Sequence, residues 1–201
     1  MVGRSAEEIT NELNYDNGFI GAPALYDIDN DGQLEIIATG MDSRLYVVSS
    51  SGEDWGVYPK EICVPEFCGQ IGKRSITSPA IGDIDNDGDI DFGITTNEAV
   101  NNGSKSVSYL LDAQTGEYFE GWPFGVRGLV GEAVLLPVIG EGHPASLAFA
   151  DLDLDGDMDL LSASADDDKI AWYESDGNPT PAFTPHTLST TAASAVYAAD
   201  L

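Results

Sequence analysis

One phrase occurs three times in this chain, and its repetition constrains the fold more than any other feature of the sequence. The copies begin at Pro23, Pro79 and Leu147, and each has four mostly apolar residues followed by Asp-x-Asp-x-Asp-Gly-x-x-Asp/Glu. The copies lie 56 and 68 residues apart, and a fourth, incomplete copy begins at Ala195. A period of this length predicts propeller blades or another repeat array.

The segments that follow each acidic phrase predict short strands joined by hairpins. The first set of apolar segments covers 34–39, 90–95 and 158–163, and the second set covers 45–48, 107–111 and 170–173. Each segment of the second set is followed by a turn glycine, which is Gly52, Gly116 or Gly177. A further short segment is expected around 55–58 and again around 118–122. Each repeat therefore reads as about four strands, which makes the chain all-β.

Three segments depart from this repeating pattern. Residues 5–8, Ser-Ala-Glu-Glu, form a capping-box pattern that predicts a short peripheral helix over about 6–14. The polar stretch 97–105 makes the second repeat longer and predicts a long hairpin tip. The segment 132–139 contains a proline and is expected to be an extended edge segment.

The acidic phrase has the chemistry of a cation-binding loop. Four carboxylates within nine residues repel one another strongly unless a cation lies between them. Alternate positions 1, 3 and 5 can point inward from a tight loop, glycine at position 6 permits a sharp turn, position 7 can offer its carbonyl, and position 9 closes the cage. Hard oxygen ligands in a flexible loop suit Ca²⁺ better than Mg²⁺. Solvated acidic turns are the alternative, which three copies in register disfavour.

This loop differs from an EF-hand. That loop closes with a bidentate glutamate at position 12 between two helices. Position 12 is here Ala38, Ile94 or Ser162, and the flanking segments resemble strands.

Composition excludes several classes of function. The chain has 201 residues with 35 acidic and 8 basic side chains, a net charge of −27. This charge argues against binding to nucleic acids and to anionic membrane surfaces. No apolar run approaches the roughly 20 residues of a membrane span. The first residues lack a signal-peptide core, so either the protein is cytosolic or its leader lies outside this chain.

The remaining reactive and aromatic side chains leave alternatives open. Cys63 and Cys68 are either free thiols or a local disulfide, which would suit an oxidising compartment. His143 and His186 are expected in surface turns, without a nucleophile motif nearby. The tryptophans are expected to pack between blades, and a ligand-stacking surface is the alternative; they are Trp55, Trp122 and Trp172.

The repeats resemble the FG-GAP/VCBS-type repeats of integrin-α-like β-propellers over roughly 17–201. The resemblance implies blades of four antiparallel strands, with a calcium loop in the hairpin between the first two strands. Two departures favour the bacterial-type branch of the family. The tripeptide Gly21-Ala22-Pro23 precedes its loop, whereas the integrin repeats place it afterwards, and Leu154 stands where the other loops have asparagine.

The resemblance also implies about three calcium sites and their ligands. The first loop would use Asp27, Asp29, Asp31 and Glu35 with the carbonyl of Gln33; the second Asp83, Asp85, Asp87 and Asp91 with the carbonyl of Asp89; the third Asp151, Asp153, Asp155 and Asp159 with the carbonyl of Asp157. Neither departure removes a ligand.

We therefore expect a partial propeller of about three four-stranded blades and the start of a fourth, with further repeats of the same parent chain as partners. The expected segments are 1–16 before the repeats, 17–72, 73–141 with its insertion and 142–190 as three repeats, and 191–201 as the start of the fourth.

The expected function is that of a non-catalytic calcium-binding module of a secreted or cell-surface protein, with a protein or carbohydrate ligand and a role in adhesion or ligand binding. The alternative is the propeller part of an exported carbohydrate-active enzyme, a lyase or glycosidase, with a carboxylate pair on one face. The carboxylates outside the three loops show no privileged pair, which favours the non-catalytic reading.

Overall fold

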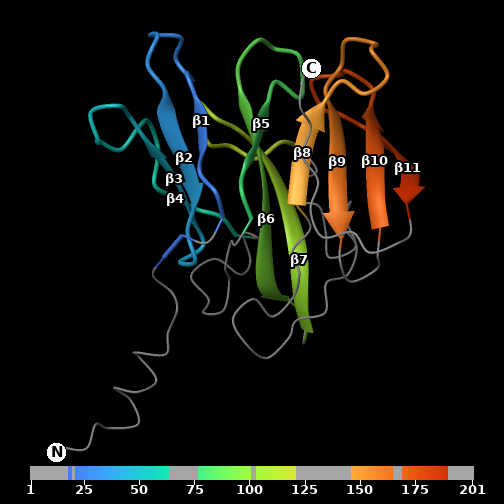
Figure 1. Ribbon diagram of the computed structural model, residues 1–201, viewed down its shortest axis with the longest axis horizontal. Helices are drawn as coiled ribbons and strands as arrows, with labels where there is room; N and C mark the ends of the chain where they lie inside the picture. The colour runs from blue at the N-terminus through green and yellow to red at the C-terminus, as the bar shows by residue number, and fades with distance from the viewer. Residues whose placement is uncertain are drawn as a thin grey trace, which may run out of the picture.

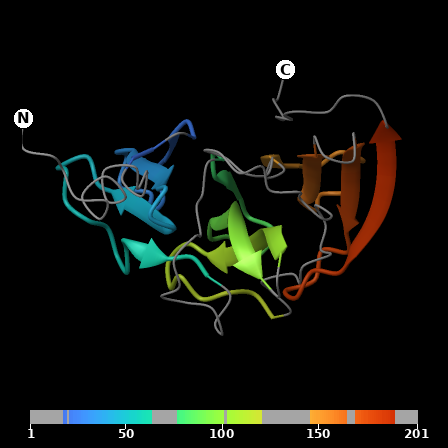
Figure 2. The same ribbon diagram turned by 90° about the horizontal axis from the view of Figure 1, so that it is seen from below.

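The computed structural model describes residues 18–19, 21–63, 77–100, 103–120, 146–164 and 169–189. These residues form three antiparallel sheets that lie side by side in chain order (Figures 1 and 2). The described part contains no helix, and it therefore offers no helical span for a membrane. The expected all-β, propeller-like class is confirmed.

The first sheet consists of four strands that are neighbours in the order of the chain. They are β1 (Ala24–Tyr26), β2 (Glu35–Thr39), β3 (Arg44–Val48) and β4 (Lys60–Glu61). The alternation of buried and exposed residues along β2 is that of a strand with two different faces.

The second and third sheets repeat this plan. The second contains β5 (Ala80–Gly82), β6 (Asp91–Val100) and β7 (Gly103–Asp112), and an isolated bridge joins Leu111 to Tyr118 where a fourth strand would lie. The third contains β8 (Ser146–Ala150), β9 (Asp159–Ser164), β10 (Lys169–Ser175) and β11 (Phe183–Ser189).

The first hairpin of every sheet has the same register. The residue before loop position 1 pairs with loop position 9 in all three sheets; the pairs are Tyr26 with Glu35, Gly82 with Asp91, and Ala150 with Asp159. The acidic loops therefore occupy equivalent places, in the hairpin between the first two strands of each sheet.

Apolar side chains fill the two spaces between neighbouring sheets. Between the first and second sheets, Ile37, Leu45 and Val47 pack with Phe92 and Leu111. Between the second and third sheets, the buried cluster contains Ala80, Leu110, Phe149, Leu160 and Tyr173. Each internal interface is thus a face-to-face contact between two sheets, which holds the edges that carry the acidic loops together.

One detail of the strand prediction is wrong. Residues 55–58 are not the fourth strand of the first repeat: Asp54 makes only an isolated bridge with Val48, and the fourth strand is β4, after Pro59. The stretch 97–105 forms the end of a long hairpin, as predicted, and β6 and β7 stay paired there from Asn97–Ser106 to Val100–Gly103. Polar residues can extend a ladder because every added pair satisfies backbone groups.

Other sequence predictions fall on residues that the structure does not describe. These are the helix at 6–14, the edge segment at 132–139, the side chains of Cys68, Trp122 and His143, and the residues after 189. The repeat boundaries stay predictions, because they also fall in such segments.

Candidate metal centres

All three acidic loops lie at one edge of the molecule, at the top of Figure 1. Each loop leaves the first strand of its sheet and returns into the second, so the register of that hairpin sets its span. Positions 1 and 9 flank the ends of the two strands. Residues eight apart in sequence are thereby brought to one point.

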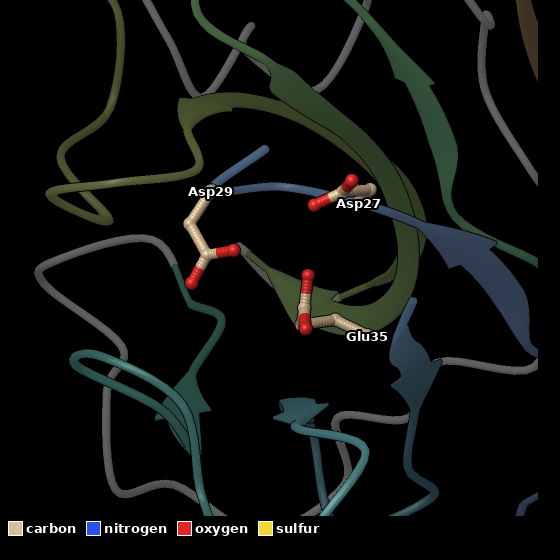
Figure 3. A group of neighbouring side chains, drawn as sticks. All are labelled: Asp27, Asp29 and Glu35. Carbon is tan, nitrogen blue, oxygen red and sulfur yellow. The ribbon is translucent and has the colours of Figure 1, made fainter. Parts of the chain in front are cut away.

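Loop positions 1, 3 and 9 converge in every sheet. Each of these carboxylates offers an oxygen, and the three oxygens lie within 4.8 Å of one another. Figure 3 shows the first of these groups, in which the side chains surround a common space. We call the three groups the acidic triads; they are Asp27, Asp29 and Glu35; Asp83, Asp85 and Asp91; and Asp151, Asp153 and Asp159.

Backbone amides hold the carboxylate at position 1 in place. Asp27 accepts hydrogen bonds from Asp31 N and Gly32 N, both at 2.9 Å. Asp83 accepts the equivalent bonds at 3.1 and 3.0 Å. The chain can curl around this carboxylate because Asn30 and Gly32 both adopt positive φ, at 58° and 87°. Glycine and asparagine tolerate this conformation better than other residues.

The carboxylate at position 9 is buried and anchored. Glu35 is 2% exposed and Asp91 1%. Glu35 accepts a hydrogen bond from Ile28 N at 2.9 Å, and Asp91 accepts one from Ile84 N at 2.8 Å. Since the Ile28 side chain is itself in the core, position 2 fastens the loop to the sheet while its amide orients the carboxylate.

The third triad has an additional anchor. Asp159 accepts hydrogen bonds from Leu152 N and from Ser175 N of β10, both at 2.9 Å. This carboxylate therefore joins its own loop to a neighbouring strand.

Position 5 plays a different part from positions 1, 3 and 9 in the described loops. The position 5 carboxylates accept hydrogen bonds from the backbone amides of position 7, from Gln33 to Asp31 at 2.7 Å and from Asp89 to Asp87 at 2.8 Å. The equivalent bond in the third loop, from Asp157 to Asp155, measures 3.0 Å. Position 5 thus braces the second half of the loop and lies outside the triads.

The electrostatics of the second triad are those of crowded, partly desolvated carboxylates. Burial, with the nearby charge of Asp85, raises the pKa of Asp91 to about 8, against the effect of its hydrogen bond from Ile84. Burial and the charge of Asp87 also raise the pKa of Asp85. The pKa of Asp153 in the third triad is raised in the same way. A cation between such groups would favour their charged forms.

The donor set fits a hard divalent cation. Each triad supplies only oxygen atoms, its ninth position is pre-oriented by a backbone amide, and its charge is otherwise uncompensated by any basic side chain of the described loops. Carboxylates in flexible loops are the ligands that Ca²⁺ takes in proteins. A bound ion would supply the positive charge that these loops lack.

Some contacts at the loops were not foreseen from the sequence. Asn86 Nδ2 donates to Asp157 Oδ1 at 2.7 Å and joins the second loop to the third. Ser50 donates to Gln33 Oε1 at 2.6 Å, and Trp55 Nε1 lies 3.4 Å from Asp29 Oδ2. For the bond between the second and third loops, the sequence offered one signal, which is the asparagine at position 4 of two copies.

The described tryptophans and histidine lie close to these sheets. Trp55 packs against the cluster between the first two sheets, as the core interpretation predicted. Trp172 of β10 stacks on His186, with ring centroids 4.5 Å apart. His186 lies in β11 and contacts Glu174 at 2.8 Å, so its expected place in a turn is wrong. Pro181 lies just before β11 and Pro185 lies within it, and these prolines favoured a turn over a strand in the sequence analysis.

Taken together, the equivalent hairpins and their acidic triads define a repeat protein of the propeller type with an acidic loop, able to hold a metal ion, in each described sheet. The family model of the FG-GAP-like repeat matches residues 27–94 and 151–201, more than half of the sequence and all three loops. The chain therefore belongs to the FG-GAP-like repeat family. Searches of curated proteins and of solved structures gave no significant match.

Proposed function

We propose that the chain is a calcium-binding β-propeller repeat module. The observation that carries this proposal is the acidic triad that recurs in the same register of all three sheets. A solvated acidic turn has no need of a buried carboxylate, yet position 9 is buried in each copy: Glu35, Asp91 and Asp159 are 1–2% exposed. Burying a carboxylate without compensation is costly.

Calcium is the cation that this arrangement favours. Its coordination sphere accepts six to eight oxygen ligands in flexible geometry, whereas Mg²⁺ demands near-ideal octahedral geometry. Each triad supplies three of these oxygens, and the predicted additional ligands are the position 5 carboxylates and the position 7 carbonyls. Occupied loops would fix the hairpins and so stiffen the edge of the molecule.

We place the module in a secreted or cell-surface protein. Cys63 is disulfide-bonded. Disulfides persist in oxidising compartments, where millimolar calcium is also available to weak sites. Adhesion or the binding of a protein or carbohydrate is the role we propose for the calcium-stiffened surface.

We propose a binding role rather than catalysis for this chain. The acidic side chains in the loops are committed to the triads and to their backbone anchors. The described histidine is engaged with Glu174 and with the Trp172 ring. Purified protein should therefore show no turnover of polysaccharide substrates, and turnover that is lost on changing one carboxylate outside the loops would favour a carbohydrate-active enzyme.

Calorimetric titration with CaCl₂ tests the proposal. The wild-type chain should bind calcium, and Asp83→Asn should remove the contribution of one site because it removes a triad oxygen. Asp89→Asn is the matched control: it removes the same charge from the same loop, but the Asp89 side chain lies outside the triad. The proposal fails if the wild type shows no binding, or if both variants weaken binding equally, which would indicate non-specific attraction to negative charge.

A further inference from the structure

The second and third acidic loops are joined by a hydrogen bond between side chains. These loops leave strands β5 and β8, which are neighbours in the structure (Figure 1). Asn86 Nδ2, at position 4 of the second loop, donates to Asp157 Oδ1, at position 7 of the third loop, over 2.7 Å. Asp157 Oδ2 lies close to Gly177, in the segment after β10, where there is no Cβ atom to exclude it. The Asp157 carboxylate is therefore held between the second loop and its own sheet.

This bond connects residues that lie among the predicted metal ligands. Asn86 lies between Asp85, a member of the second triad, and Asp87, at position 5. Asp157 offers its own carbonyl as a predicted ligand and lies two residues before Asp159, a member of the third triad. The conformation of either loop therefore affects the position of ligands in the other.

Burial distinguishes the positions at this contact from their equivalents in the other loops. Asp85 is half-buried, whereas position 3 of the other two triads is exposed. Asp157 is also half-buried, whereas position 7 of the other two loops, Gln33 and Asp89, is exposed. The second and third loops thus cover part of each other at the residues next to the bond.

The same two loops also share an apolar cluster. Ile84, at position 2 of the second loop, has no exposed surface and belongs to the cluster between the second and third sheets. Met158, at position 8 of the third loop, packs against this cluster. Ile84 N donates to Asp91, and Met158 directly precedes Asp159, so each apolar residue adjoins the buried carboxylate of its own triad.

The first loop has a different kind of contact with its neighbouring sheet. Gln114 Nε2 donates to the carbonyl oxygen of Ile28, at position 2 of the first loop, over 3.3 Å. Gln114 lies in the turn after β7 and outside the acidic loops. The first loop therefore serves as an internal comparison for the other two.

We propose that the second and third loops bind calcium cooperatively, and that the Asn86–Asp157 bond couples them. The inference rests on the calcium-binding function proposed above. Asn86 and Asp157 would act as positioning residues, because each fixes the loop that carries the ligands of the other centre.

The ordering of the loops gives the direction of this coupling. The carboxylates of each metal-free loop repel one another, so binding of a cation holds the loop in one conformation. A contact between two loops contributes more when one of them is already ordered, because less conformational freedom is lost when the second becomes ordered. Calcium in either loop should therefore raise the affinity of the other, and by the same factor in both directions.

The size of the coupling is limited by the contact that carries it. One hydrogen bond, expressed as an equilibrium constant, changes affinity about two- to ten-fold. The charge of a bound cation acts in the opposite direction, because each ion reduces the attraction of the acidic chain for the next ion. Salt screens this charge effect, with a Debye length of about 8 Å at 0.15 M. The coupling should therefore be measured at this ionic strength.

Titration of the full chain with CaCl₂, followed by NMR, measures each loop separately. The amides at position 6 report on the three loops, because each donates to the position 1 carboxylate of its own triad; they are Gly32, Gly88 and Gly156. Asp153→Asn removes a ligand of the third loop. It should lower the affinity of the second loop, read from Gly88, about two- to ten-fold, and leave the first loop, read from Gly32, unchanged.

Variants of the two bonded residues test whether the bond carries the coupling. In an Asn86→Gly background, Asp153→Asn should no longer change the affinity of the second loop. Asn30→Gly is the matched control, because Asn30 has the same loop position and a similar φ, 58° against 57°. Asp157→Ala should also abolish the coupling while it keeps the backbone carbonyl, and Asp89→Ala is its control at position 7 of the second loop. Thermal melts show whether each variant has folded.

The outcomes separate the coupling from the proposed function. Position 6 amides that do not respond to CaCl₂ would overturn the calcium-binding function and the coupling with it. Loops that bind calcium, with a second loop indifferent to Asp153→Asn, would overturn the coupling alone. Coupling that persists in both Asn86→Gly and Asp157→Ala would overturn the role of the bond.

Discussion

Asn86 donates a hydrogen bond from Nδ2 to Oδ1 of Asp157 at 2.7 Å, across 71 residues of sequence. Asn86 is position 4 of the second loop, and Asp157 is position 7 of the third. This bond is the direct link between two acidic loops within the described residues. It connects the two candidate metal centres at the edge where they lie.

We expect Asn86→Gly to destabilise the protein by about 0.5–1.5 kcal/mol, the usual net value of one hydrogen bond. Asn86 has φ of 57°, which glycine adopts without strain, so the loss should report the bond. Asn30→Gly is the control, because Asn30 has φ of 58° at the same position of the first loop. Urea unfolding measures both. Equal changes in the two variants would show that the bond contributes nothing.

The metal-free protein should lose stability as the pH rises from about 4 to 8. The folded state keeps the proton of Asp91 up to a pKa of about 8, chiefly because the group is buried, whereas an unfolded chain releases it near its ordinary value. Since the folded state binds more protons in this interval, raising the pH favours unfolding. The raised pKa values of Asp85 and Asp153 act in the same direction.

Urea unfolding in chelator at pH 5 and pH 8 measures this effect. Asp91→Asn should flatten the dependence, because the amide does not titrate. Excess calcium should reverse it, because the cation favours the charged carboxylate. Metal-free stability that increases toward pH 8 would contradict the prediction.

Leu154→Asn should stabilise the protein by about 0.5–2 kcal/mol. Leu154 has φ of 65° and its side chain is 86% exposed, so it bears backbone strain without any compensating burial. Asparagine occupies this position in the other two loops and tolerates the conformation better. Leu152→Asn is the control, with a similar change of side chain at a position without positive φ. Thermal unfolding in calcium compares them, and a Leu154→Asn melting temperature at or below that of the wild type would refute the strain argument.

Gly93→Ala should destabilise the protein by about 1–3 kcal/mol through overpacking. A Cβ atom at this position would lie 2.5 Å from Cζ of Phe149, in the interface between the second and third sheets. Gly82→Ala should cost less, because the equivalent approach to Phe149 is 3.1 Å. Urea unfolding of the two variants should therefore rank them in this order, and the reverse ranking would mean that Phe149 moves freely.

The repeat and the loop spacing carried most of the information that could be predicted. Asp-x-Asp-x-Asp-Gly indicates a hairpin because its carboxylates accept hydrogen bonds from nearby backbone amides and its glycine permits a sharp turn. The apolar segments that follow this phrase predict β2, β6 and β9. The spacing within this phrase also predicted that positions 1, 3 and 9 come together in each acidic triad.

Features that depend on contacts between distant segments could not be predicted from the sequence. The fourth strand β4 contains only Lys60 and Glu61, and its place depends on the pairing partner in β3 rather than on its own composition. Position 5 turns toward the amide of position 7, a choice between two partners that spacing alone does not decide. The Asn86–Asp157 bond depends on how neighbouring sheets are set against each other.

The anchor of Asp159 makes one backbone amide an indicator of the third loop. Ser175 N lies in β10, sixteen residues away, yet its hydrogen bond goes to the carboxylate of that loop at 2.9 Å. The amide hydrogen of Ser175 can exchange with solvent only when its hydrogen bond to the carboxylate breaks or the strand opens. A single resonance in an exchange experiment would therefore reveal how firmly the acidic loop between β8 and β9 is held, without any label placed in the loop itself.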